Sequence, residues 1–213
     1  MNQKNRMIPT QFASKMCIYE LEIKDVKFKV SVIDDADVID KKISELSGML
    51  FKMRRVVGFD VKFNSQTRIA EMLILSAANL CLAIQLCRLS RIPESVTNFL
   101  ADRTICFVGF GVDKKTASIH GKTGYPRNCD TGIDLGHLAA RVLKKPKLIG
   151  LTGIAELAKE VGIDHNSLSN KEIEAVTPPN WNAWVFTDKQ VLHAVEEARG
   201  CYIVADKLLS LLN

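Results

Sequence analysis

"VVGFDVKF", Val56 to Phe63, is the stretch on which the interpretation of this sequence depends. Its apolar residues predict a buried β-strand, yet Asp60 and Lys62 lie within it. Side chains two residues apart on a strand point to the same face of a sheet. The sequence therefore places a carboxylate and an ammonium group side by side on one face of an apolar strand, which points to a site rather than to ordinary core.

Composition describes an ordinary globular chain. Its 213 residues are 47% hydrophobic and 25% charged, which is enough for one sizeable core. A net charge of +5 does not by itself indicate a nucleic-acid-binding protein. The longest apolar run, 72–87, is broken by Asn79, so no membrane partner is expected. We expect a disordered tail over 1–15, without a secretory signal, and a single domain over 16–213.

The six cysteines form no CxxC pair and have no histidine at zinc-finger spacing. We interpret them as reduced thiols, which indicates an intracellular protein of the nucleus or cytoplasm.

Hydrophobic periodicity changes along the chain. Alternation predicts an N-terminal β-hairpin over 17–33 and further strands at 56–63, 69–77, 81–87 and 105–112. Helical period is expected over 34–50, 92–102, 113–121, 133–145, 151–162 and 188–213. Strands come first and helices dominate the second half. This order indicates one α/β domain, a mixed central sheet of about five strands flanked by helices.

Seven segments in order carry a family resemblance. They are VVGFDVKF, RIAEMLILSAANLCLAIQL, IPESVTNFLAD, CFVGFGVDKK, IDLGHLAARVL, LTGIAELAKEVGI and NWNAWVFTDKQVLHAVEEARGCYIVADKLL. From about Cys17 to Leu212 the chain resembles the plant DEDD-superfamily (DEDDy) 3′–5′ exonucleases of the Werner-syndrome-exonuclease type. The resemblance implies a ribonuclease-H-like exonuclease fold.

The resemblance also implies a reaction, two-metal hydrolysis of phosphodiester bonds. Four carboxylates hold two Mg²⁺ ions, and a Tyr or His positions the attacking water. Asp60 matches the first Asp of the family pattern, but the Glu two residues later is Lys62. The position of the second-motif Asp is Lys115. On the last helix the Tyr position is His193 and the Asp position is Glu197.

Charge arithmetic argues against a metal pair here. Asp60 and Glu197 contribute −2, and Lys62 and Lys115 contribute +2, so the four positions sum to zero. A divalent ion 4 Å from an ammonium group is repelled by roughly 8 kcal/mol at an effective dielectric constant of 20. We therefore expect no cofactor, with Lys62 paired to Asp60 or Glu197. Asp60, His193 and Glu197 remain as a relic catalytic site, and Asp60 and Glu197 are its only candidate metal ligands.

Two ways in which the site could still be active are disfavoured: a replacement carboxylate from Asp113, and His193 acting as the base. Asp113 would need a register shift to replace the carboxylate lost at Lys115. His193 would act as the base only with an Asp one residue beyond Glu197, where the chain has Ala198.

Binding of single-stranded RNA or DNA is one function that a degenerate site could retain. Lys62, Lys114, Lys115, Lys122 and Arg127 are candidate phosphate contacts, and Lys144, Lys145 and Lys147 form a second cluster. The alternative for the first cluster is a plain solvated helix face. Candidate base-stacking residues are Phe59, Phe63, Phe110, Trp181 and Trp184.

Three functional hypotheses remain open. The first is a degenerate exonuclease-like protein that binds nucleic acid or joins homo- or hetero-oligomers with active relatives, as the resemblance implies. The second is an active exonuclease that uses Mg²⁺ or Mn²⁺ on Asp60 and Glu197. The third is a protein-interaction scaffold without nucleic-acid binding.

Overall fold

The computed structural model describes residues 9–123, 132–164, 168 and 180–212, the side chains of 120–123 excepted. Within this part of the chain, seven strands form one mixed sheet in the order β1-β2-β5-β4-β3-β6-β7. They are β1 (Ile18–Ile23), β2 (Val26–Ile33), β3 (Val56–Phe63), β4 (Ala70–Ala77), β5 (Leu80–Gln85), β6 (Cys106–Gly109) and β7 (Gly132–Asp134). The pairs β1-β2, β3-β4 and β4-β5 are antiparallel, and the other three pairs are parallel. The predicted mixed sheet is confirmed.

The predicted number of about five strands is wrong, for two reasons. The N-terminal hairpin is not separate, because β2 pairs in parallel with β5 and joins the main sheet. The three-residue β7 is too short to show a period-two pattern in the sequence. Its residues overlap the predicted helix over 133–145, which begins only at Leu135.

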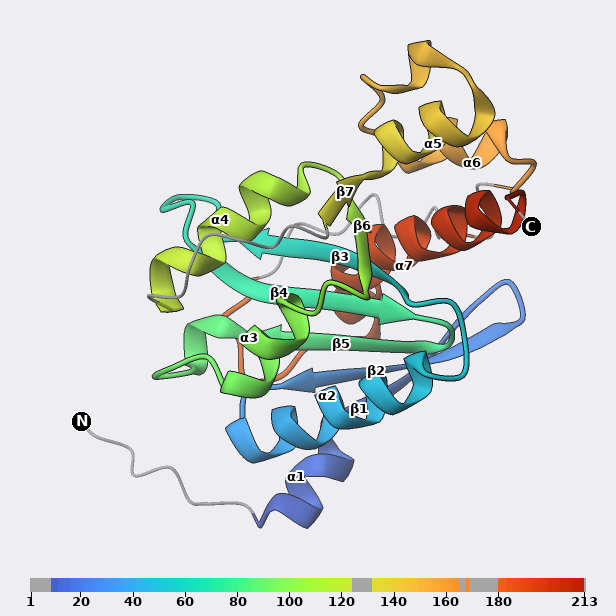
Figure 1. Cartoon of the computed structure of the whole chain (residues 1–213). Coiled ribbons are helices and arrows are strands. Elements are labelled where there is room, and N and C mark those ends of the chain that lie inside the picture. Colours follow the sequence, from blue (N-terminus) through green and yellow to red (C-terminus); the bar gives the residue numbers. More distant parts are fainter. Residues whose placement is uncertain (1–8, 124–131, 165–167, 169–179, 213) are drawn as a thin grey trace.

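Helices cover both faces of the sheet (Figure 1). They are α1 (Thr10–Met16), α2 (Ala36–Leu50), α3 (Glu94–Leu100), α4 (Val112–Thr123), α5 (Leu135–Leu143), α6 (Ile154–Glu160) and α7 (Asp188–Ser210), with short 3₁₀ turns η1 (Leu86–Arg88) and η2 (Pro146–Leu148). In Figure 1, α2 and α3 lie in front of the sheet and α7 lies behind it. No helix among the described residues has the length and apolar character needed to cross a bilayer.

The predicted N-terminal tail differs in part from the structure. Residues 10–15 belong to helix α1, which packs near α2, while residues 1–8 lie outside the described part of the chain.

Strand β3 places its residues on two different faces, as the alternation predicts. Phe59 and Val61 belong to the core that includes Ile39 and Leu46 of α2. Gly58, Asp60 and Lys62 have the opposite parity and face α7. The side chains that β3 turns toward α2 are apolar, so its two charged residues, Asp60 and Lys62, lie on the α7 side.

Close contact between α7 and β3 depends on Gly58. A Cβ atom at Gly58 would lie 1.9 Å from the carbonyl oxygen of Ala198, in the middle of α7. Only a glycine lets the two backbones approach this closely. Because α7 lies so close to β3 at this point, Glu197, the neighbour of Ala198, is held beside Asp60.

The start of α7 is fixed by a reciprocal cap. The Thr187 hydroxyl accepts from the backbone N–H of Gln190 at 3.3 Å, and the Gln190 side chain accepts from the N–H of Thr187 at 2.9 Å. Such a capping box satisfies N–H groups that have no partner inside the helix. It sets the register of α7, and with it the positions of His193 and Glu197.

Candidate functional site

Asp60 is a buried carboxylate held by two lysines. Its side chain is 2% exposed, and Oδ1 accepts from the backbone N–H of Val61 at 2.7 Å. The Lys115 Nζ lies 2.5 Å from Oδ1, and the Lys62 Nζ lies 2.7 Å from Oδ2. The Lys62 contact is a largely buried ion pair. The predicted pairing of Lys62 is present, and Asp60 is its partner.

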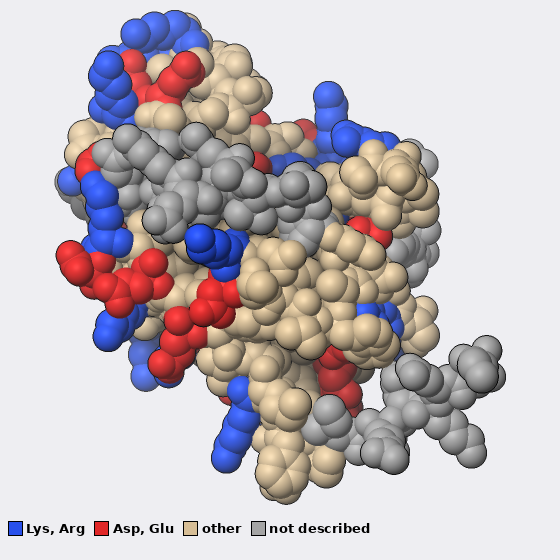
Figure 2. Space-filling view, turned by 180° about the vertical axis from the view of Figure 1, so that it is seen from behind, with Lys and Arg blue, Asp and Glu red and all other residues tan. Residues whose placement is uncertain are grey.

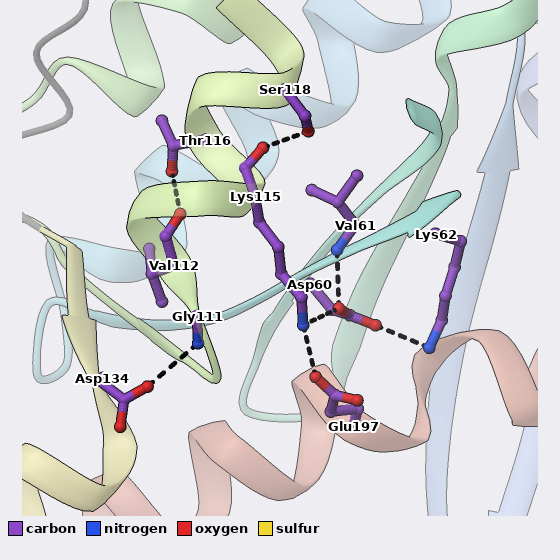
Figure 3. A network of polar contacts seen from close by, with 10 residues as sticks. All are labelled: Asp60, Val61, Lys62, Gly111, Val112, Lys115, Thr116, Ser118, Asp134 and Glu197. Atoms are coloured by element: carbon purple, nitrogen blue, oxygen red, sulfur yellow. Dashed lines mark hydrogen bonds and ion pairs between the residues drawn. The ribbon is translucent and has the colours of Figure 1, made fainter. Parts of the chain in front are cut away.

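Lys115 bridges two carboxylates. Besides Asp60, its Nζ donates to Glu197 Oε1 at 2.6 Å (Figure 3). The Lys115 side chain comes from α4, Asp60 from β3 and Glu197 from α7. One ammonium group thus joins three elements that are far apart in the sequence. We call Asp60, Lys62, Lys115 and Glu197 the ionic cluster.

The charges of the ionic cluster stabilise one another against burial. Burial alone raises the pKa of Asp60, but the Lys62 and Lys115 ammonium groups outweigh it and hold that pKa below its ordinary value. Burial lowers the pKa of Lys115, but the Asp60 and Glu197 carboxylates outweigh it and raise that pKa. Both groups therefore stay charged at neutral pH, as ion-paired buried groups do.

The turn before α4 aims Lys115 into the cluster. Gly111 has φ +60°, a left-handed conformation that suits glycine, and its N–H donates to Asp134 Oδ2 at 3.0 Å. Asp134 Oδ1 also accepts from the N–H of Gly136 at 3.0 Å, which caps α5. Sequence reasoning missed Asp134, although its position before the LGHLAARVL helix is a cap signal.

His193 lies one turn before Glu197 on α7 and packs against an aromatic ring. Its imidazole is stacked on Trp181, with the ring centroids 6.1 Å apart and an interplanar angle of 10°. Burial and the Lys62 charge lower the pKa of His193, and the Asp60 charge opposes them in part. The ring is therefore uncharged at neutral pH and acts as a packing partner of Trp181.

Beside this stack lies a cavity of about 330 Å³, lined by Phe63, Asn64, Ser65, Gln66, Glu71, Asn180 and Trp181. The buried Glu71 accepts a hydrogen bond from Asn64 Nδ2 at 2.9 Å there. A β-bulge between Lys62 and Phe63 re-aims side chains at this point. Sequence reasoning missed this bulge, because one extra residue leaves no clear signal in the pattern.

The other predicted residues lie outside the ionic cluster. Asp113 and Lys114 are exposed in the first turn of α4, and Ala198 is buried against Gly58. The side chains of Lys122 and Arg127 lie outside the described residues. In the second lysine cluster, Glu160 pairs with Lys145 at 2.5 Å and with Lys147 at 3.5 Å.

The cluster does not fit a metal pair. A divalent ion needs carboxylate oxygens turned toward it, but Lys115 already bridges Asp60 and Glu197 as a shared cation. The described residues contain no group of three or more His, Cys, Asp or Glu side chains able to hold a metal ion. As it stands, the arrangement stabilises the contact between β3, α4 and α7.

Comparison with known proteins shows the fold. No protein-family model and no curated protein matches the chain. Among solved structures, the EXD2 exonuclease domain soaked in Mn and Mg superimposes with a TM-score of 0.50 at 23% identity, covering 85% of this chain and 89% of that one. The same domain soaked in Mn and dGMP gives a TM-score of 0.50 at 23% identity, covering 85% and 90%.

At this identity the likeness shows the architecture and does not extend to activity. The chain therefore has the ribonuclease-H-like fold that is also seen in the EXD2 exonuclease domain.

Proposed function

We propose that this protein is a catalytically degenerate member of the exonuclease fold that binds single-stranded nucleic acid without hydrolysing it. One observation carries the proposal: the Lys115 ammonium group lies 2.5 Å from Asp60 and 2.6 Å from Glu197. Lys62 adds a second ammonium group at 2.7 Å from Asp60. A divalent ion would have to displace these cations from carboxylates that they already neutralise.

Nucleic-acid binding in this proposal rests on the surface. Lys62 and Lys115 face carboxylates inside the cluster, so most of their charge is compensated there. The chain keeps a net charge of +5, and Lys114 is exposed beside the cluster. Lys122 and Arg127 follow in the sequence. Binding through such residues is salt-sensitive and tolerant of sequence.

An activity assay tests the degenerate site. End-labelled single-stranded RNA and DNA are incubated with Mg²⁺ and, separately, with Mn²⁺. We expect the full-length oligonucleotide to persist. Shortening from the 3′ end that disappears in Asp60→Ala would show an active nuclease and overturn the proposal.

A salt titration tests the binding. We expect affinity for a single-stranded oligonucleotide to fall steadily as salt rises, because bound counterions are released. Lys114→Ala should reduce the slope of log affinity against log salt by about one contact. Absence of binding at low salt would leave the scaffold hypothesis in its place.

A further inference from the structure

Among the aromatic side chains suggested for base stacking, Trp184 is set apart by its exposure. It is 67% exposed, whereas Phe59, Phe110 and Trp181 are at most 8% exposed. Phe63 is half-buried beside the cavity. The neighbouring Val185 is also exposed, at 79%. Single exposed apolar residues are common, but adjacent ones such as Trp184 and Val185 form an apolar patch of the kind that marks an interaction site.

One face of the Trp184 ring is backed by a cation. The Arg88 guanidinium carbon lies 3.5 Å from the ring centroid. Arg88 also donates to the carbonyl oxygen of Asn182, which fixes the guanidinium under the indole. Among the described residues, the buried Arg88 Nε has no hydrogen-bond partner. We call Trp184 and Arg88 the stacking platform, because the guanidinium holds one face of the indole and leaves the other face open.

The segment that carries Trp184 is anchored by its backbone carbonyls. Gln85 Nε2 donates to the carbonyl oxygens of Trp181 and Ala183, each at 2.9 Å. The Tyr19 hydroxyl donates to the carbonyl of Phe186 at 3.2 Å. These bonds come from β1 and β5, so the indole projects from a segment tied to the sheet. A preorganised ring loses little entropy when a ligand stacks on it.

The platform lies at the same end of the sheet as the ionic cluster. Lys62 on β3 is opposite Met72 on β4, and Met72 is opposite Gln85 on β5. Neighbouring strands are about 4.8 Å apart, so Gln85 lies roughly 10 Å from Lys62. Arg88 follows Gln85 by three residues, and exposed Arg91 follows Arg88. Two arginines, Arg88 at the indole and the exposed Arg91, thus belong to the segment that follows β5.

We propose that Trp184, backed by Arg88, is a stacking platform for an unpaired base of single-stranded nucleic acid. The free face of the indole accepts any base, since every base has a π face. Arg88 and Arg91 provide the positive charge that a polyanion requires. The inference rests on the proposed function and deepens it, because it names the side chains on which an unpaired base would stack.

Binding of a labelled, mixed-sequence single-stranded oligonucleotide, followed by fluorescence anisotropy, tests the platform. We expect Trp184→Leu to weaken binding about tenfold, as loss of one stacked base does. Trp184→Phe keeps a π face and should recover part of the affinity. The slope against salt should stay unchanged in both variants, because stacking releases no counterions.

Phe51 supplies a matched control. It is 77% exposed, and the Arg55 guanidinium carbon lies 4.9 Å from its ring centroid, but it stands at the end of α2. Phe51→Leu removes an exposed aromatic ring backed by arginine without touching the platform. We expect it to bind as the unmodified protein does, with circular dichroism showing that all variants are folded.

The outcomes separate the two proposals. If the unmodified protein binds no oligonucleotide, the proposed function and the platform both fail. If it binds and Trp184→Leu matches Phe51→Leu, only the platform fails. If Trp184→Leu instead changes the sedimentation of the protein while oligonucleotide affinity holds, the indole is a protein contact and the platform is overturned.

Discussion

At the scale of single residues, the ionic cluster depends on Asp60, which faces two ammonium groups and is almost fully buried. Removing one partner of a buried ion pair is far more damaging than removing an exposed one, because an uncompensated charge stays behind. Glu197 has a side chain that is 36% exposed, so water can replace it at Lys115. The two carboxylates of the cluster should therefore respond very differently to mutation.

We predict that Asp60→Asn destabilises the protein by about 3–5 kcal/mol, because Lys62 and Lys115 then face each other without a carboxylate between them. Glu197→Gln should cost less than about 1 kcal/mol. Urea unfolding measures both. Equal losses of unfolding free energy in the two variants would contradict the account, in which Asp60 is buried and Glu197 is partly exposed to water.

The pH dependence of stability follows from Asp60. Its pKa in the folded protein is below its ordinary value of 3.8, so its contribution is fully present above that value. The contribution is lost as the pH falls through the lowered folded pKa. We expect the urea midpoint to drop below pH 3.8 more steeply in the unmodified protein than in Asp60→Asn. If the urea midpoints of the two proteins fall in parallel as the pH is lowered, the ion pairing of Asp60 with Lys62 and Lys115 is contradicted.

At the scale of elements, the close approach of α7 to β3 holds the site together. We predict that Gly58→Ala destabilises the protein by about 1–3 kcal/mol or more, because the new methyl group meets the Ala198 carbonyl at 1.9 Å.

Gly48 is the control for Gly58, since it lies in α2 and a methyl group added there would have no atom within 4 Å. Gly48→Ala should stabilise the helix by about 0.5–1 kcal/mol. Thermal unfolding of both variants checks this, and similar melting temperatures would contradict it.

The elements also show which parts of the fold could be predicted from the sequence alone. The run Val56–Phe63 is the strand that alternation predicted. The helix predicted over 34–50 is present as α2, and Asp35 caps it by accepting from the N–H of Val38. Short β7 lies below the length at which a pattern can be read. The pairing of β2 with β5 joins residues some fifty positions apart, and no local pattern records such a contact.

The same limit applies to the site. Asp60, Lys62, Lys115 and Glu197 could be selected because each occupies a position in a family pattern. The Trp181–His193 stack and the Arg88–Trp184 pair follow no such pattern. They exist because the segment before α7 folds back over β5, and only the three-dimensional structure reveals that path.

At the scale of the whole molecule, the charges of the buried ionic cluster cancel, and the net positive charge comes from the rest of the chain. The ionic cluster sums to zero, so the net charge of +5 lies elsewhere in the chain. On the face seen in Figure 2, lysine and arginine side chains stand beside aspartate and glutamate, with wide uncharged areas between them. This mixed surface favours moderate, salt-sensitive binding over a strong general affinity for polyanions.

The central proposal is that Lys62 and Lys115, paired with Asp60, leave no room for a metal ion at this carboxylate. Isothermal titration calorimetry with Mn²⁺ tests it on the unmodified protein and on the triple variant Lys62→Glu, Lys115→Asp, Glu197→Asp, which introduces carboxylates at the three positions where the exonuclease pattern that the sequence resembles has them. The account predicts no Mn²⁺ binding to the unmodified protein and measurable binding to the triple variant. Binding to the unmodified protein that disappears in Asp60→Ala would contradict it.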